Sequence, residues 1–458
     1  MNRAGLNLKR GAVWVWLALL LAAGPRAGAA NSLTWSKEKN RVAADISDWN
    51  LVEVLERVAA ATGWEVYVDP GAQRKVSTKF KDRALDKALD LLLGNLSRVL
   101  LLQTNGDAPR LLVFRSREKE ATQLVRPKPE DKTAQPIPNE LVVTLKKGAS
   151  IDELAKRLGA KVIGRADGLN AYRLQFEDAA GANAARDALR GNEDVTAVDN
   201  NYWAQRPEGS DGFNGAGAPA LSLKPKAPAD GKQQIIGLID TAVQKTGANY
   251  DNFLLPAIAV AGETKLSETT PTHGTAMLEN ILNGLATGEK ETAWKVLPVD
   301  VYGNNPNTTT FDVASGIFKA IEAGANPINL SLGSSGDSEF LHSVIKAGFD
   351  QGILFIAAAG NEPVATPTFP GAYPEVLAVT AIGPDGKVAS YANFGSFVDL
   401  GVSGNSVITF NGQNWFTSGT SVSTAKVTGR AAAEARGGKI SLEQIRAALQ
   451  AQAGVRKP

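Results

Sequence analysis

The chain has 458 residues, of which 43% are hydrophobic and 21% charged, a composition typical of folded domains and unlike that of disordered or fibrous chains. Its length predicts about two to four domains, and its formal net charge of +2 gives no electrostatic basis for binding nucleic acid. The sequence has no cysteine and only two histidines, His273 and His342, which excludes disulfides, thiolate metal sites and a cysteine nucleophile.

The first 29 residues have the pattern of a secretory signal peptide. Arg3, Lys9 and Arg10 precede an apolar run over residues 13–23, and the small residues Ala27-Gly28-Ala29 form the cleavage pattern. The run is shorter than the roughly 20 residues that a membrane-spanning helix needs, and an uncleaved anchor is the alternative. Removing this segment takes away four basic residues and no acidic one, so the formal charge falls from +2 to −2. We therefore expect an exported protein, located in a periplasm or outside the cell.

Residues 33–115 predict a small α+β domain with the element order β-α-β-β-α-β-β. Asn50, followed three residues later by a glutamate, forms a capping-box pattern at the start of an amphipathic helix that ends at Gly63. The segments AADISDW (43–49) and GWEVYV (63–68) resemble the short N-terminal domain of secretins and TonB-dependent receptors. The resemblance implies a module that binds an envelope protein, and a generic α+β unit is the alternative.

A second α+β unit is predicted over residues 139–204, between two linkers. Residues 116–138 lack periodicity and mix charges with proline, which is typical of a linker. In the unit itself the order is β-α-β-β-α-β, and Ser150 with a glutamate three residues later forms a capping box. Residues 205–233, rich in Gly, Ala and Pro, form the second predicted linker.

Residues 234–458 change to short continuous apolar runs that alternate with amphipathic helical patterns. Runs that are apolar on both faces indicate buried parallel strands, so this region predicts a doubly wound, mostly parallel α/β sheet. The predicted strands cover residues 235–239, 296–299, 328–330, 353–356 and 376–379. In such folds ligands bind beyond the carboxyl ends of the strands, which directs attention to polar residues that follow the apolar runs.

Three such residues are Asp240, His273 and Ser421. Asp240 follows the first predicted strand, and His273 and Ser421 each stand at the start of a predicted helix. Each alone has an ordinary structural explanation, as a turn residue, a packing residue or a helix cap. Together, their order Asp, His, Ser, with spacings of 33 and 148 residues, is the order of the subtilisin triad. His342, in contrast, lies in mid-helix among core-type residues and is predicted to have a packing or surface role.

Residues 234–436 resemble the catalytic domain of subtilisin-like serine peptidases, the subtilases. The motifs that carry the resemblance are GLIDT (237–241), THGT (272–275), INLSLG (328–333), AAAGN (357–361) and GTSVSTA (419–425). A serine esterase of the α/β-hydrolase type is excluded, because Ser421 lacks the Gly-x-Ser-x-Gly motif and the Ser-Asp-His order is absent.

The resemblance implies a role for each motif. Ser421 would be the nucleophile, His273 the general base and Asp240 the residue that orients the imidazole. Asn361 would donate its side-chain amide to the developing oxyanion, together with the Ser421 N–H. The segments expected to bind an extended polypeptide substrate are Ser331-Leu332-Gly333 on a strand edge and Ala358-Ala359-Gly360 on the opposite wall.

By position and element order, the 139–204 unit resembles the propeptide of the same family. This implies a self-processing zymogen in which residues 200–204 lie in the cleft like a product, with the cut within 205–233.

The chain departs from the family pattern in three places: Ala242 stands where Gly is usual, Ala276-Met277-Leu278-Glu279 stands where His-Val-Ala-Gly is usual, and Ala425 stands where Pro is usual. The departures keep open the alternative of a weak or inactive subtilase-like binding module of the cell envelope. The resemblance is compatible with calcium, but no acidic cluster has the spacing of a calcium loop, so we assign no metal and no cofactor.

Overall fold

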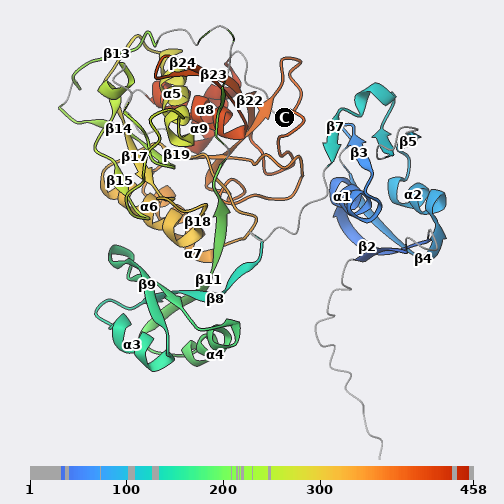
Figure 1. Ribbon diagram of the computed structural model, residues 1–458, viewed down its shortest axis with the longest axis horizontal. Coiled ribbons are helices and arrows are strands. Elements are labelled where there is room, and N and C mark those ends of the chain that lie inside the picture. The colour runs from blue at the N-terminus through green and yellow to red at the C-terminus, as the bar shows by residue number, and fades with distance from the viewer. Residues whose placement is uncertain are drawn as a thin grey trace, which may run out of the picture.

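The computed structural model describes residues 32–36, 41–72, 74–101, 109–125, 134–207, 209–212, 215, 217, 221–228, 231–245, 249–435 and 441–452. They form three units along the chain, coloured from blue to red in Figure 1. The predicted signal peptide lies outside the described residues. Among the described residues, none of the helices combines the length and apolar character needed to cross a membrane.

The first unit consists of two small sheets and two helices. One sheet contains β1 (Ser32–Ser36), β2 (Arg41–Asn50) and β4 (Lys75–Ala84), in the order β1-β2-β4. The other has the order β5-β6-β3-β7 and contains β3 (Glu65–Val68), β5 (Ser97–Leu101), β6 (Arg110–Phe114) and β7 (Gln123–Val125). The helices are α1 (Leu51–Thr62), α2 (Leu85–Leu93) and the short 3₁₀ helix η1 (Glu118–Glu120).

Strand β7 extends the first unit into the segment that the sequence predicts as a linker. It pairs with β3 in an antiparallel register, and Val125 is buried in the same hydrophobic cluster as the rest of the unit. Phe394 and two partly buried neighbours of the C-terminal unit, Ala365 and Val388, pack against this cluster as well. The first unit therefore contacts the C-terminal unit through apolar side chains.

The second unit is a sheet covered by two helices. Its elements are β8 (Pro136–Leu145), α3 (Ile151–Leu158), β9 (Lys161–Ala166), η2 (Asp167–Leu169), β10 (Ala171–Gln175), α4 (Ala179–Leu189) and β11 (Val195–Gln205). The strand order is β18-β11-β8-β10-β9, in which β18 (Asn307–Thr309) belongs to the third unit. One sheet thus continues from the second unit into the third, as the long β11 arrow in Figure 1 indicates.

The third unit is built on a parallel sheet of seven strands in the order β15-β17-β14-β19-β20-β21-β22. Its strands are β14 (Gln234–Asp240), β15 (Ile258–Ala259), β17 (Trp294–Asp300), β19 (Ile328–Leu330), β20 (Phe355–Ala358), β21 (Val376–Ile382) and β22 (Leu400–Ser403). The helices are η3 (Asn249–Phe253), α5 (His273–Ala286), α6 (Thr310–Glu322), α7 (Glu339–Asp350), α8 (Thr420–Ala435) and α9 (Leu442–Gln450). The predicted doubly wound α/β architecture is confirmed.

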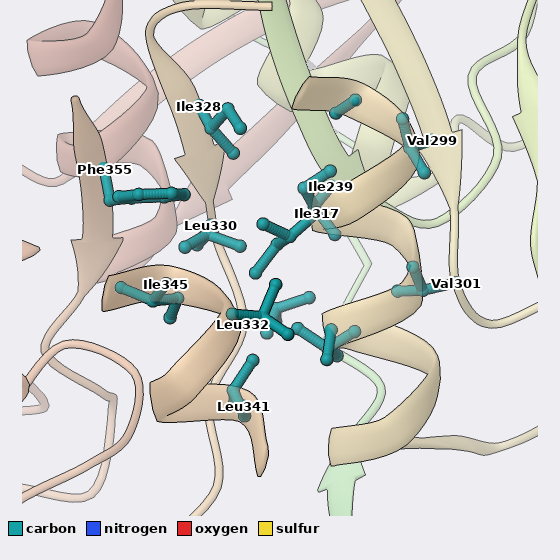
Figure 2. Packing of buried hydrophobic residues seen from close by; sticks show 14 of the residues in the cluster. Ile239, Val299, Val301, Ile317, Ile328, Leu330, Leu332, Leu341, Ile345 and Phe355 are labelled. Carbon is teal, nitrogen blue, oxygen red and sulfur yellow. The ribbon is translucent and has the colours of Figure 1, made fainter. Parts of the chain in front are cut away.

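Helices cover both faces of this sheet, which explains the continuous apolar runs. On one face Ile317 of α6 and Ile345 of α7 pack against Leu330, as Figure 2 shows. On the other face α5 and α8 pack against alternate residues of β14, among them Leu238. Because each strand buries both sides, its side chains need no polar alternation.

Short strands and one hairpin complete the structure. They are β12 (Asp211–Gly212), β13 (Lys224–Pro225), β16 (Glu291–Thr292), β23 (Asn405–Phe410) and β24 (Gln413–Ser418). β12 pairs with β24, and β13 pairs with β16, so parts of the predicted linker 205–233 add strands to the third unit. β24 ends two residues before α8 begins, and it therefore leads directly into the helix that carries Ser421.

Candidate active site

Asp240 and His273 form a buried pair at the carboxyl end of β14. His273 Nδ1 lies 2.8 Å from Asp240 Oδ1 and 3.0 Å from Oδ2, and both side chains are almost fully buried. Asp240 also accepts a 2.7 Å hydrogen bond from the backbone N–H of Thr241. The bond from the Thr241 N–H therefore fixes the Asp240 carboxylate at the end of β14, and the carboxylate can hold the imidazole in one orientation.

The position of His273 depends on a close contact between α5 and the chain after β14. Thr272 caps the helix by accepting from the N–H of Thr275, which places His273 at the first helical position. Gly274 donates its N–H to the Thr241 hydroxyl at 2.8 Å, and a Cβ on Gly274 would lie 2.2 Å from the Thr241 carbonyl oxygen. Only glycine allows this approach, which brings the helix start onto the strand end.

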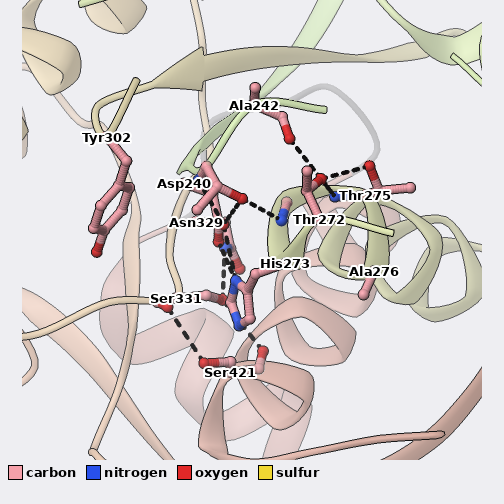
Figure 3. Close-up of polar contacts among 12 residues, drawn as sticks. Asp240, Ala242, Thr272, His273, Thr275, Ala276, Tyr302, Asn329, Ser331 and Ser421 are labelled. Atoms are coloured by element: carbon pink, nitrogen blue, oxygen red, sulfur yellow. Dashed lines mark hydrogen bonds and ion pairs between the residues drawn. The ribbon is translucent and has the colours of Figure 1, made fainter. Parts of the chain in front are cut away.

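Ser421 lies at the start of α8, facing the end of β19. Its Oγ donates to the carbonyl oxygen of Ser331 at 3.3 Å, and the Ser331 Oγ donates in return to the Ser421 carbonyl at 3.2 Å. Figure 3 shows Ser421 beside the Asp240–His273 pair. In this structure the serine hydroxyl is thus bonded to Ser331 and not to the imidazole of His273.

Asn361 is attached to the same helix start by its acceptor atom. Its Oδ1 accepts from the N–H of Thr420 at 2.8 Å and from the Thr420 hydroxyl at 3.0 Å. With the oxygen engaged, the side-chain NH₂ of Asn361 has no partner among the described residues and lines the cavity next to Ser421. An amide donor beside a serine at a helix N-terminus can stabilise negative charge on a bound oxygen atom.

A cavity of about 570 Å³ opens beside Ser421 and Asn361. Of the residues predicted to bind substrate, five line it and one does not. Those in the lining are Ser331, Leu332, Gly333, Ala358 and Gly360. Ala359 is fully buried and donates its N–H to the carbonyl of Val379 in the neighbouring strand, so it supports the wall from behind.

Sequence reasoning missed Asn393, which shapes the wall of this cavity. Asn393 donates its N–H to Gly360 and its Nδ2 to Thr368, and its Oδ1 accepts from the N–H of Glu362. A Cβ on Gly360, whose φ is +109°, would lie 2.4 Å from Asn393 Nδ2. No motif near Asn393 signals this role, because it depends on a contact between distant loops.

The end of the second unit enters the same cleft. β11 pairs antiparallel with β18, with Trp203 opposite Thr309 and Gln205 opposite Asn307. The residues that follow, Arg206 and Pro207, line the cavity that contains Ser421, together with Gln205. Further along the chain, β12 pairs with β24, the strand that leads into the helix carrying Ser421.

Two side chains of β11 bind the N-termini of helices in the third unit. Asp199 accepts hydrogen bonds from the N–H of Phe340 at 2.8 Å and the hydroxyl of Ser338 at 2.9 Å, at the start of α7. Asn201 accepts from the N–H of Phe311 at 3.1 Å, at the start of α6. Burial raises the pKa of Asp199, while the bond from the Phe340 N–H opposes this rise.

Glu279, which stands where the subtilase pattern has Gly, is buried on α5. Burial raises its pKa to about 7, against the opposing effects of hydrogen bonds with Tyr250 and the backbone of Thr409. Within the described ranges, no three His, Asp or Glu side chains gather closely enough to hold a metal ion. His342 lies away from the cleft, bonded to Glu375 and stacked on Tyr373.

Comparisons with known proteins agree with this geometry. Residues 231–457 match the subtilase family model, and residues 123–201 match that of the fervidolysin N-terminal prodomain. A thermophilic serine proteinase from Bacillus sp. (strain AK1) is 31% identical over 225 residues, covering 47% of this chain and 55% of the relative. Thermitase from Thermoactinomyces vulgaris is 29% identical over 228 residues, covering 48% of this chain and 81% of the relative. The match thus spans only about half of the first of these relatives.

Solved structures show the same fold. Fervidolysin from Fervidobacterium pennivorans, a keratinolytic enzyme related to subtilisin, has a TM-score of 0.54 at 18% identity, covering 68% of this chain and 57% of that one. A mutant of the epidermin leader peptide processing serine protease from Staphylococcus aureus has a TM-score of 0.50 at 15% identity, covering 65% and 89%. The chain therefore carries a subtilisin-like serine peptidase domain of the subtilase family, preceded by a propeptide-like unit.

Proposed function

We propose that this protein is an exported serine endopeptidase that works through an Asp240-His273-Ser421 triad and an acyl-enzyme. The observation that carries the proposal is the 2.8 Å bond between buried Asp240 and His273, beside a serine that stands at a helix start. This arrangement provides an oriented base, a nucleophile and an amide donor at the edge of one cavity.

The reaction follows from these groups. Ser421 Oγ rotates from the Ser331 carbonyl toward His273, which accepts its proton as the oxygen attacks the substrate carbonyl carbon. The developing oxyanion is stabilised by the Asn361 NH₂ and the Ser421 N–H. His273 then donates the proton to the leaving amine, and a water molecule, activated by the same imidazole, hydrolyses the acyl-enzyme. Catalytic hydrogen bonds are often long in unliganded sites and tighten when substrate binds.

We also propose that the chain is made as a self-processing zymogen. Strand β11, which pairs with β18 as far as Gln205, leads Gln205, Arg206 and Pro207 into the cavity beside Ser421. A cleft filled by its own chain is closed to other polypeptides until a bond in the segment after β11 is cut. We place that cut within residues 205–233.

Export and an envelope partner complete the proposal. The signal-peptide pattern of residues 1–29 supports secretion to a periplasm or the medium, and the resemblance of residues 33–115 supports binding to an envelope protein. The N-terminal residue of the protein recovered from culture fractions tests both: a start near residue 30 supports export, and a start beyond residue 115 contradicts a retained binding module.

The alternative is an inactive binding module, and the bond between the Ser421 hydroxyl and the Ser331 carbonyl favours it. Labelling with a fluorophosphonate distinguishes this module from an active peptidase. We expect an adduct on Ser421 once the propeptide-like unit is removed. We further expect the Ser421→Ala chain to keep its full length, whereas the wild-type chain is cut at a rate independent of dilution. If the purified Ser421→Ala protein is cut in the same way as the wild-type protein, self-processing is contradicted. If the processed wild-type protein does not react with the fluorophosphonate, the inactive module is favoured.

A further inference from the structure

Arg206 follows β11 directly and is held by a loop of the third unit, residues 300–305. Its Nη2 donates to the carbonyl oxygen of Gly303 at 2.7 Å, and its Nε donates to that of Asn305 at 3.0 Å. The guanidinium carbon lies 5.1 Å from the centre of the Tyr302 ring. Three different groups of one loop therefore contact this one side chain.

The loop is held in place by contacts of its own. Asp300 Oδ1 accepts the backbone N–H groups of Tyr302 at 2.9 Å and Gly303 at 3.0 Å, which folds the chain back after β17. Gly303 has a φ of +57°, and a Cβ there would lie 2.5 Å from the Ala261 carbonyl oxygen. Tyr302 itself is fully buried. The carbonyl groups and the ring face are thus fixed in position by contacts that do not involve Arg206.

The same loop also sets the register of the incoming chain. The Tyr302 hydroxyl donates to the Gln205 carbonyl at 2.9 Å, and the carbonyl of Pro306, the residue that follows the loop, accepts the backbone N–H of Arg206 at 3.2 Å. These bonds use only main-chain atoms of the bound segment, so any extended polypeptide can form them. The position of Arg206 is therefore a fixed place in the cleft at which the loop contacts whichever side chain is present.

Two carbonyl acceptors and an aromatic face match a guanidinium better than other side chains. A guanidinium presents several donors in one plane and can stack on a ring, whereas an ammonium group provides a point charge with different geometry. A neutral or apolar side chain loses the charge-assisted bonds and the cation–π contact. Both acceptors are backbone atoms, which explains why no residue motif in the sequence indicates the site.

We propose that the loop 300–305 is a specificity site that selects arginine at one position of the polypeptides this enzyme cleaves, the position that Arg206 occupies in the uncut chain. The inference rests on the proposed function, since it assigns a substrate preference to the same cleft. Arg206 would then be the chain's own copy of the preferred residue.

The first experiment changes only the substrate. Peptides with the sequence of residues 199–212 carry arginine, citrulline or lysine at position 206, and a control peptide carries alanine in place of the exposed Gln205. With the processed wild-type enzyme we expect kcat/KM to fall about tenfold or more for citrulline, which is neutral and nearly isosteric, and to fall less for lysine. The Gln205 control should stay near the parent value. Equal rates for the arginine and citrulline peptides would overturn the proposal.

The second experiment needs no catalysis, so it separates this inference from the proposed function. Hydrogen exchange is measured in the full chain with Ser421→Ala, alone and combined with Arg206→Gln, Arg206→Lys or the matched control Arg190→Gln. Arg190 is an exposed arginine of the same unit, paired with Asp187. We expect Arg206→Gln to speed exchange of the amides of residues 203–206 at least about fivefold, Arg206→Lys to speed it less, and Arg190→Gln to leave it unchanged.

The outcomes differ for the two proposals. Faster exchange in Arg206→Gln together with no hydrolysis of any peptide would overturn the proposed function and support the arginine site. Hydrolysis of all peptides at one rate, with exchange in Arg206→Gln like that in Arg190→Gln, would overturn the arginine site and leave the peptidase assignment intact.

Discussion

Asn361 and Thr420 are joined by a 2.8 Å hydrogen bond, in which the backbone N–H of Thr420 donates to the side-chain oxygen of Asn361. The bond connects the loop after β20 to the start of the helix that carries Ser421. It also determines which end of the Asn361 amide faces the cavity, because the oxygen is engaged and the NH₂ group is left to donate.

This relationship gives a clean test of the oxyanion donor. Asn361→Asp keeps an acceptor for Thr420 but replaces the NH₂ donor with an oxygen, so the helix start is retained while the donor is lost. We expect kcat for peptide hydrolysis to fall about 10²–10³-fold or more, with a smaller change in KM. The thermal unfolding temperature checks that the fold is retained. A kcat within about threefold of wild type would remove Asn361 from the mechanism.

The Asp240–His273 pair predicts a second loss of turnover. Asp240→Asn keeps the shape of the side chain but presents a neutral group to His273 Nδ1, which favours the wrong imidazole tautomer. We expect the self-cleavage rate of the full chain to fall about 10³–10⁴-fold. Asp350→Asn is the control, since Asp350 is an exposed residue at the end of α7 that pairs with Lys346. Normal cleavage in the Asp240→Asn chain would rule out the triad.

Glu279 predicts a pH-dependent stability. Its pKa is raised from 4.5 to about 7 in the folded protein because it is buried. Between these two pH values the unfolded chain has lost the proton while the folded chain keeps it, so raising the pH favours unfolding. The stabilising contribution is complete below pH 4.5 and is lost as the pH rises through about 7.

Glu279→Gln should remove this dependence. In urea titrations of the Ser421→Ala chain between pH 4.5 and about pH 8, we expect the free energy of unfolding to fall further when Glu279 is present than in the Glu279→Gln variant. The difference should reach up to roughly 3 kcal/mol. Glu322→Gln, an exposed change on α6, serves as the control. If the free energy of unfolding depends on pH in the same way with and without the Glu279→Gln substitution, burial does not raise the pKa of this carboxyl group.

Asp199 predicts how firmly the propeptide-like unit is held. Asp199→Ala removes both hydrogen bonds to the start of α7 and leaves the N–H of Phe340 without its acceptor. We expect the loss to be about 1–2 kcal/mol, or about tenfold in affinity of the cut propeptide-like unit for the peptidase domain. Inhibition of the processed enzyme by the released unit measures it. The matched control is Asp178→Ala, which removes the N-cap of α4 away from the interface. If the Asp199→Ala and Asp178→Ala units inhibit the enzyme equally, the role of Asp199 is contradicted.

The sequence predicted the parts of the site that depend on local patterns. Asp240, His273 and Ser421 were predicted together, from their order along the chain and from the motifs that resemble those of subtilases, because each alone has an ordinary structural explanation. The parallel sheet followed from the same apolar runs, since a strand buried on both faces has a distinct pattern.

Contacts between distant segments were not predictable in this way. Asn393 supports Gly360, and Tyr302 contacts Arg206, across sequence separations that no motif connects. The pairing of β11 with β18 also escaped prediction, because β18 has only three residues and no apolar alternation. The bond between Ser421 and Ser331 depends on a side-chain rotamer, which a sequence does not specify.

The tethered segment between Gln205 and β12 has a consequence for the cell that makes this protein. Because the segment is covalently attached, it competes with any bystander polypeptide at a local concentration in the millimolar range or above. Under the self-processing proposed above, each newly made molecule would therefore act on other polypeptides only after it has first cut itself. The timing of that proposed cut would then determine where proteolytic activity first appears.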